Sequence, residues 1–303
     1  MSFLAMVAAD GALQNSGNPI AMQRSVHITQ IRNATVLIEA AGHGVLVDPM
    51  LAPRGALPSL KYLGGERRRN PIVDLPPDSD TLLARATHAL ITHCQRGHFD
   101  HLDRLGKRWL RERQLPVLCM PHDASYLAER GLAVQVLDAD GPTDVLGGRV
   151  TPVRCLHGRG WIGTLMAHGH GYVIDWPGEP SVYVAGDTVL TDDVLDTVRR
   201  LGRDSVSVLP AGGAAMDLGG ELIMDADQAL RAAAAGGGRF VMNHLEALDH
   251  CPTQRRALRA EACRRGLEDR VLVPEDGATL VFDRAATRSA APPHRPPEQA
   301  HAR

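Results

Sequence analysis

The residues with the clearest chemistry lie in one short segment, 92–103, which reads THCQRGHFDHLD. Its second half places His98, Asp100 and His101 within four positions. Neutral imidazole and carboxylate are the usual protein ligands of zinc, iron and manganese. This concentration of ligand side chains indicates a metal site.

The spacing within the segment suggests how many ions it serves. On a regular helix, at about 100° per residue, Asp100 would point away from the face that His98 and His101 share. A turn between a strand and a helix could instead offer the three ligands to two adjacent ions, roughly 3.5–4 Å apart. The alternative is a helix N-terminus that carries histidines by chance, with Asp100 favoured by the helix dipole. Because His93 joins the same segment in a chain of 14 histidines, we favour a two-metal site.

The flanking patterns predict the turn that such a site needs. Residues 88–92 (HALIT) predict a strand, and residues 101–113 predict a helix. The apolar stripe of that helix consists of Leu102, Leu105, Trp109 and Leu110. Loops at the edge of a rigid sheet are where sites are built, so further ligands should also follow strands. Three candidates stand at the ends of predicted strands: His157, Asp187 and His244.

Strand and helix patterns alternate along most of the chain and predict an α/β fold. A β-meander is expected over residues 26–49, because three β-branched runs are separated by short turns. Later strands are expected at 117–120, 133–137, 149–156, 172–176, 181–187, 205–210, 240–244, 270–274 and 278–282, with helices at 123–130, 192–201, 225–235 and 253–265. We expect one domain over residues 25–284, a flexible leader over 1–24 and a disordered tail over 285–303.

Composition limits the class of protein and its partners. The chain has 303 residues, 44% of them hydrophobic, and a net charge of −2, which suits a soluble protein with a small-molecule substrate. No basic face is indicated, so we expect neither nucleic acid nor a membrane as partner, and a homo-oligomer is left open. Five cysteines without a CxxC motif, and no charged region ahead of the first apolar run, indicate free thiols in a cytoplasmic protein.

A long segment without periodicity, residues 49–77, contains six prolines and the basic cluster Arg67, Arg68 and Arg69. Loops of this length are usually functional or disordered, and we interpret this one as a lid over a site. The arginines have two interpretations. They could bind an anionic group of the substrate, or they could be a solvated run of charge.

The order of the motifs carries a family resemblance. VDP, then TH…HxDHxD, then a histidine after a strand, then AGDT and NHLEALDHC, together resemble the metallo-β-lactamase superfamily over residues 26–283. More narrowly, the chain is similar to the stand-alone bacterial metal-dependent hydrolases, the group that includes ascorbate-6-phosphate lactonase. The resemblance implies a four-layer αββα sandwich, two mixed sheets face to face with helices outside, and a site at one edge.

The resemblance also implies roles for individual residues. His98 and His157 would bind the first metal, Asp100, His101 and His244 the second, and Asp187 would bridge both. The cofactor would be two divalent ions, zinc first, with manganese or iron as alternatives. Asp48 would hold a ligand imidazole through its other ring nitrogen. Two residues near His244 would support a ligand or contact substrate, or else begin a helix: Glu246 and His250.

The sequence departs from the family pattern at one point. The family reads TH-x-H-x-D-H, whereas residues 94–97 here separate His93 from His98. The extra residues must bulge, and Gly97 could turn the chain back because glycine tolerates positive φ. We predict that His93 remains a ligand of the first metal and that Gln95 and Arg96 project toward the mouth of the site. The alternative is a displaced His93 and a single bound ion.

The function that these residues imply is hydrolysis by a metal-bound hydroxide at a dinuclear site, with Asp100 orienting the water or taking its proton. The substrate would carry a lactone, ester or amide bond. Phosphodiester hydrolysis is one alternative, and a mononuclear-iron oxidoreductase of the persulfide dioxygenase type is another. A third is a degenerate member that binds metal without turnover.

Overall fold

A computed structural model describes residues 25–61, 66–95, 97–160, 163, 166, 169–216 and 220–284. The predicted leader, the predicted tail and Arg96 lie outside these residues. None of the helices in the described part of the chain is both long and apolar enough to cross a membrane. All five cysteines are free thiols, three of them buried.

The first sheet has seven strands in the order β16-β1-β2-β3-β4-β5-β6. Its antiparallel part is the predicted meander, closed by the last strand of the chain, and its other part is parallel. The strands are β1 (Ser25–Arg32), β2 (Thr35–Ala40), β3 (His43–Val47), β4 (His88–Leu90), β5 (Pro116–Cys119), β6 (Ala133–Val136) and β16 (Thr279–Asp283).

The second sheet repeats this plan, in the order β15-β14-β11-β10-β9-β8-β7. Strands β7 to β10 pair antiparallel, and β10, β11, β14 and β15 pair in parallel. The strands are β7 (Thr143–Val145), β8 (Gly148–Arg154), β9 (His170–Asp175), β10 (Ser181–Val184), β11 (Ser205–Pro210), β14 (Arg239–Asn243) and β15 (Val271–Leu272). A small hairpin, β12 (Ala215–Met216) with β13 (Gly220–Glu221), stands apart.

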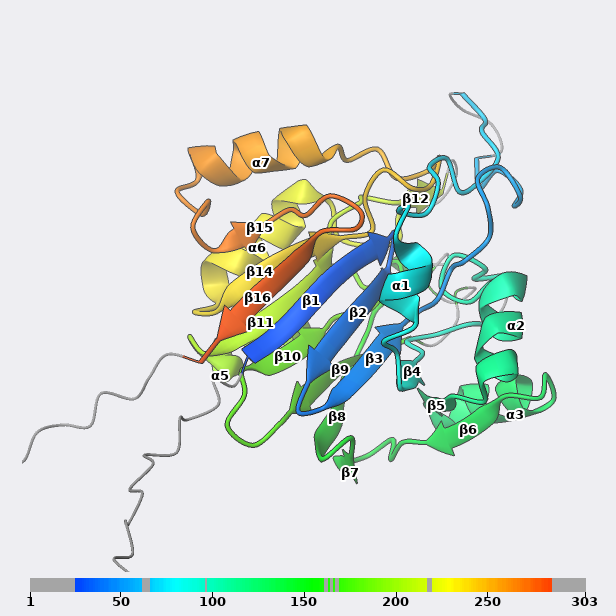
Figure 1. Ribbon diagram of the computed structural model, residues 1–303. Helices are drawn as coiled ribbons and strands as arrows, with labels where there is room; N and C mark the ends of the chain where they lie inside the picture. Colours follow the sequence, from blue (N-terminus) through cyan, green and yellow to red (C-terminus); the bar gives the residue numbers. More distant parts are fainter. Residues whose placement is uncertain are drawn as a thin grey trace, which may run out of the picture.

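Helices cover the outer face of each sheet, which gives four layers (Figure 1). The first sheet carries α1 (Ser79–Leu83), α2 (Arg104–Arg113) and α3 (Pro121–Ala128), and the second carries α5 (Asp192–Leu201), α6 (Ala226–Ala235) and α7 (Arg255–Arg264). The predicted αββα sandwich in a single domain is therefore confirmed.

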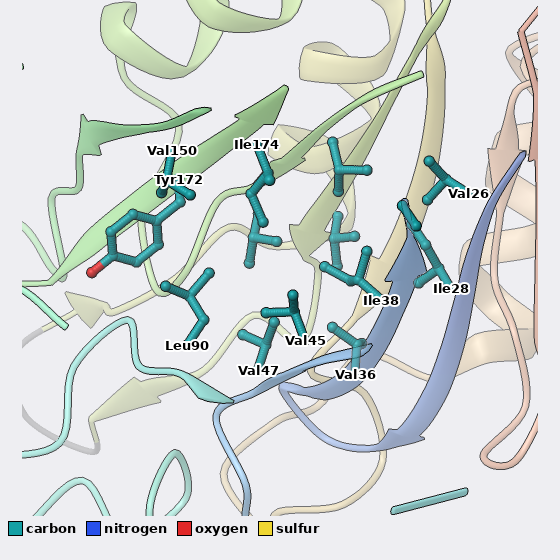
Figure 2. Close-up of a cluster of buried hydrophobic side chains, with 14 of the residues drawn as sticks. Val26, Ile28, Val36, Ile38, Val45, Val47, Leu90, Val150, Tyr172 and Ile174 are labelled. Atoms are coloured by element: carbon teal, nitrogen blue, oxygen red, sulfur yellow. The ribbon is translucent and has the colours of Figure 1, made fainter. Parts of the chain in front are cut away.

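The main core lies between the two sheets (Figure 2). Alternate residues of the meander point into it, because side chains of a strand alternate between faces. Val26, Ile28 and Val36 are examples from the first sheet, and Tyr172 and Ile174 oppose them from the second. Each fully buried side chain of this kind contributes roughly 1.5–3 kcal/mol. The packed layers form a rigid support for the strand ends.

Several details of the prediction need correction. Helix α2 begins at Arg104, because Asp103 is its N-cap and accepts a hydrogen bond from the backbone of Gly106 at 2.7 Å. His101 therefore lies in the preceding turn, where its direction is not set by helix geometry. Leu105 is 39% exposed, so it does not belong to the apolar stripe. The sequence reading missed three short elements: α1, β7 and the β12–β13 hairpin.

Candidate metal centre

The candidate ligands come together at one edge of the sandwich, where strands of both sheets end. Four of them follow β4 in the first sheet, and His157, Asp187 and His244 follow β8, β10 and β14 in the second. They form two groups, and within each group the ligand atoms all lie within 4.8 Å of one another. The first group is His93, His98 and His157, and the second is Asp100, His101, Asp187 and His244.

The two imidazoles of the second group have fixed orientations. His101 donates from Nδ1 to Asp48 Oδ2 at 2.8 Å, and His244 Nδ1 lies 3.5 Å from the Cys251 sulfur. Both rings are almost fully buried, and their Nε2 atoms make no hydrogen bond within the described residues. The Nε2 lone pair of each ring is therefore available to a metal ion.

The imidazoles of the first group are also held through their Nδ1 atoms. Their Nδ1 atoms pair with neutral oxygens: His93 with Thr92 Oγ1 at 3.0 Å, His98 with the Gln95 carbonyl at 2.5 Å, and His157 with the Leu222 carbonyl at 3.1 Å. The Nε2 atoms of His98 and His157 lie 3.0 Å apart. Two nitrogens on one tetrahedral zinc, each about 2.05 Å from it, would lie roughly 3.3 Å apart. All five imidazoles thus offer the same nitrogen.

Asp187 lies between the two groups. Its Oδ2 is 3.1 Å from His101 Nε2 and 3.6 Å from His244 Nε2, both in the second group, and 3.8 Å from His157 Nε2 in the first. Asp100 faces only the second group, with its Oδ2 3.6 Å from His101 Nε2. The geometry suits a carboxylate shared by two ions.

The donor set fits divalent metal ions. The Nε2 atoms of His93, His101 and His244 are buried without a hydrogen bond to the part of the chain that the structure describes. An unsatisfied buried polar group costs about 1–3 kcal/mol, so each of these nitrogens needs a partner, which a metal ion in each group would supply. Five imidazole nitrogens and two carboxylates are the ligand chemistry of zinc, manganese and iron.

The electrostatics of the two groups differ. Burial disfavours the charged form of His101, but Asp187, Asp100 and Asp48 outweigh it and hold the pKa of His101 well above its usual value. In the first group, burial lowers the pKa of His93, and the neighbouring histidines lower it further. Burial would raise the pKa of Asp187, but His101 and His244 hold it well below its usual value. His93 is therefore held neutral, whereas His101 in the second group holds a proton that a metal must displace.

Asp48 holds Thr92 and His101 in place. It follows β3, is fully buried, and accepts hydrogen bonds from the backbone and hydroxyl of Thr92 at 2.8 and 2.6 Å besides the one from His101. Its backbone has φ of +45°, an uncommon value for a residue other than glycine. Asp48 therefore contacts the Nδ1 atom of a candidate ligand, His101.

The insertion leaves His93 beside the other first-group ligands. Cys94 is buried in the hydrophobic cluster under α2 and α3, and Gly97 turns the chain with φ of +89°. His93 and His98 therefore both reach the first group. The predicted direction of Gln95 is wrong, because its amide donates to the His122 carbonyl and to Asp123 on α3 rather than facing the mouth of the site. The prediction for Arg96 lies outside the described residues.

One residue that the sequence reading missed joins two ligand segments. Asn33, buried in the turn between β1 and β2, donates from Nδ2 to the Asp100 carbonyl at 3.1 Å. Its own carbonyl accepts from the backbone of His244 at 3.0 Å. A turn asparagine with φ of +55° has an ordinary structural explanation, so the local sequence gave no signal of this role.

The two residues near His244 behave differently. Glu246 accepts hydrogen bonds from the backbone and side chain of Arg255, both at 2.8 Å, and so holds the start of α7, the second of its two expected roles. His250 is buried, and burial lowers its pKa to about 4, partly offset by Asp100. His250 therefore stands as a neutral imidazole close to the second group.

The predicted lid is tied to the loop after β14. Asn70 and Asp249 exchange two hydrogen bonds, of 2.9 and 3.0 Å, and both residues are buried. Of the three arginines, all exposed, Arg69 donates to the carbonyls of Gly55 and Ala56. Arg69 therefore holds the turn at residues 55–56. Substrate binding by Arg67 and Arg68 stays a prediction.

Similarity to known proteins decides the family. No model of a protein family matches the chain. The UPF0173 protein YddR of Bacillus subtilis (strain 168) is 32% identical over 260 residues, which cover 85% of this chain and 100% of that protein. The chain belongs to the UPF0173 family of metal-dependent hydrolases. The resemblance to the metallo-β-lactamase superfamily is confirmed, and the chain is a hydrolytic enzyme.

Solved structures share the fold of this chain. The isothiocyanate hydrolase from Delia radicum gut bacteria has a TM-score of 0.75 and 30% identity, over 85% of this chain and 99% of that one. The metallo-beta-lactamase fold protein YhfI from Bacillus subtilis has a TM-score of 0.59 at 14% identity, over 85% of this chain and 99% of that one, and shares the fold alone.

Proposed function

We propose that this hydrolase holds two divalent ions, zinc first, and cleaves a lactone, ester or amide bond of a small molecule. The observation that carries the proposal is the pair of adjacent ligand groups with Asp187 between them. His93, His98 and His157 would hold one ion, Asp100, His101 and His244 the other, and Asp187 both. Bound there, the ions would supply Lewis acidity that lowers the pKa of a water and polarises the bond to be cleaved.

The chain's own residues would orient the reactants. Burial would raise the pKa of Asp100, but the neighbouring His101, His244 and His98 lower it strongly, so its carboxylate is ionised and can accept a hydrogen bond from a water. Asp100 itself is buried, but His98 is partly exposed, so solvent reaches the centre from the side of His98. We assign Asp100 the task of orienting the attacking water.

The position of His93 bears on the oxidoreductase alternative. That alternative rested on a His93 displaced by the insertion, which would leave one ion with open positions. The bulge instead leaves His93 in the first group with its Nε2 atom buried and directed to the centre. This geometry favours two ions and hydrolysis over a mononuclear iron site.

A second candidate substrate class follows from the likeness to the isothiocyanate hydrolase. Water adds to the central carbon of R–N=C=S, and the adduct breaks down to the amine R–NH₂ and carbonyl sulfide. This carbon is an electrophile like a carbonyl carbon, so the same arrangement of ions and water would serve it. The alignment covers nearly all of that enzyme, and this observation favours the candidate.

Elemental analysis combined with a substrate panel tests both candidates. The panel contains a lactone, an ester, an amide, a β-lactam, a thioester, a phosphodiester and an aryl isothiocyanate. We expect two equivalents of metal per chain and turnover of a carbonyl or isothiocyanate substrate that Asp187→Ala abolishes. A protein with one equivalent of iron and no hydrolysis would contradict the proposal, and turnover of the phosphodiester alone would replace the substrate class.

A further inference from the structure

One of the inserted residues, Gln95, is anchored from outside the centre. The side-chain amide of Gln95 donates to the carbonyl of His122 at 2.5 Å and to Asp123 Oδ1 at 2.8 Å. Asp123 is 1% exposed and lies in the first turn of α3. The His122 ring nitrogen lies 3.3 Å from the other oxygen of this carboxylate. The buried carboxylate of Asp123 thus holds the side chain of Gln95.

The backbone of Gln95 faces the opposite way, toward the metal centre. Its carbonyl accepts the Nδ1–H of His98 at 2.5 Å and the backbone N–H of the same residue at 3.2 Å. Gln95 is therefore connected at both ends, to α3 through its side chain and to a candidate ligand through its main chain. The first-group rings of His93 and His157 have no such link to α3 among the described residues, since they pair with Thr92 and Leu222.

Such an anchor limits the conformational freedom that the insertion adds. Four residues between the two histidines have more conformational freedom than one, and a ligand nitrogen must be held within about 0.5 Å of its place. Helix α3 is a rigid support, because Leu127 packs it against Val117 and Cys119 of β5. A carboxylate buried at its start is a fixed point for the bulge.

We propose that Asp123 is a positioning residue that acts through Gln95 to orient His98 as a ligand of the first ion. The contact selects the ring orientation in which Nδ1 donates to the loop and Nε2 faces the centre. Removing a residue that holds a metal ligand in place typically weakens metal affinity by about 10–100-fold. The inference rests on the proposed two-ion centre and adds a residue from α3 to it.

The test measures metal binding rather than turnover. Gln95→Ala and Asp123→Ala remove the anchor, whereas Asp123→Asn keeps an oxygen that can accept from Gln95. Gln135→Ala, at an exposed glutamine on β6, is the matched control. Each metal-free protein is titrated with zinc against a chromophoric chelator and with cobalt by visible absorption, and its melting temperature is recorded.

We expect Gln95→Ala and Asp123→Ala to weaken one of the two equivalents about 10–100-fold and to alter the cobalt spectrum of that equivalent only. Asp123→Asn and Gln135→Ala should resemble the wild type. Unchanged affinity in Gln95→Ala would overturn the proposal. So would equal weakening of both equivalents with a lower melting temperature of the metal-free protein, since that pattern belongs to a general structural role.

A reference variant separates this inference from the proposed function. His98→Ala removes the candidate ligand itself and should lose about one equivalent of metal. If His98→Ala kept both equivalents, the ligand assignment would be wrong. If His98→Ala lost one equivalent while Gln95→Ala kept wild-type affinity for both, the centre would stand and the anchoring role of Asp123 would fall.

Discussion

Asp48 accepts a hydrogen bond from His101 at 2.8 Å, and this is the one imidazole of the five whose Nδ1 pairs with a carboxylate. The rings of the first group pair with neutral oxygens instead. A carboxylate partner fixes the tautomer of a ligand histidine and raises its basicity. The two ions would therefore meet ligands of different donor strength.

Replacing Asp187 should damage the enzyme more than replacing Asp48. Asp187 lies between both groups, so Asp187→Ala would loosen both ions, and we expect activity to fall more than roughly 100-fold. Asp48→Ala frees the His101 ring and the hydrogen bonds of Thr92 but removes no ligand, and should lower activity about 10–100-fold. Metal content and rate are measured for each variant. Full metal content and rate in Asp187→Ala would rule out the bridging role.

Removing the metal should lower stability as well as activity. The ligands come from strand ends of both sheets, so an ion bound to them favours the folded state. At a free metal concentration 1,000 times Kd, binding raises the free energy of unfolding by about 4 kcal/mol. Each kcal/mol shifts the melting temperature by about 2–4 °C in a domain of this size. Calorimetry of chelator-treated protein, verified as metal-free, measures the shift. An identical melting temperature would exclude the site.

The two ions should respond differently to pH. The pKa values of His101 and His244 are held well above normal, so the metal-free protein keeps protons there above neutrality, and binding must release them. Lowering the pH from about 8 to 6 should weaken the second ion by about tenfold per pH unit for each proton displaced. The pKa of both His93 and His157 is lowered, so the first ion should respond less.

Calorimetric titration in buffers of different ionisation enthalpy counts the protons released with each equivalent. The pH-sensitive equivalent should be the one lost in His244→Ala. If both equivalents released the same number of protons, the electrostatic difference between the groups would be refuted.

Asn33 should contribute to the second ion through Asp100 and His244. Asn33→Gly keeps the positive φ but loses the hydrogen bond to the Asp100 carbonyl, which should lower the free energy of unfolding by about 1 kcal/mol. Asn33→Ala should lower the free energy of unfolding by about 1–2 kcal/mol more than Asn33→Gly does, because alanine disfavours φ of +55°. Denaturant unfolding and metal titration measure both effects. Ala41→Gly, in an exposed turn with φ of +49°, is the control and should slightly stabilise the protein without changing metal affinity.

The strands and ligand positions could be read from the sequence because each signal is local. The meander has β-branched runs separated by turns, and His157 and His244 follow such runs directly. Their division into two groups came from the family resemblance. Periodicity alone extended α2 back to His101, because the capping bond of Asp103 to Gly106 depends on the fold around it.

The contacts that were not predicted are those between distant segments. The direction of Gln95 depends on Asp123 at the start of α3, and a pattern within residues 92–103 carries no information about that neighbour. The role of Asn33 likewise exists only once Asp100 and His244 have been brought together. Short elements such as β7, with three residues, give too little periodicity to recognise.

The pairing of β1 with β16 joins the two ends of the described chain, with Ser25 opposite Asp283. During synthesis, β1 must wait until Thr279–Asp283 have left the ribosome before its edge is covered. Such long-range pairing is slow and leaves strand edges open to aggregation in the meantime. His244 also belongs to this late part of the chain. The complete centre can therefore form only once His244 has been synthesised, so the second ion cannot be held before the second sheet is made as far as β14.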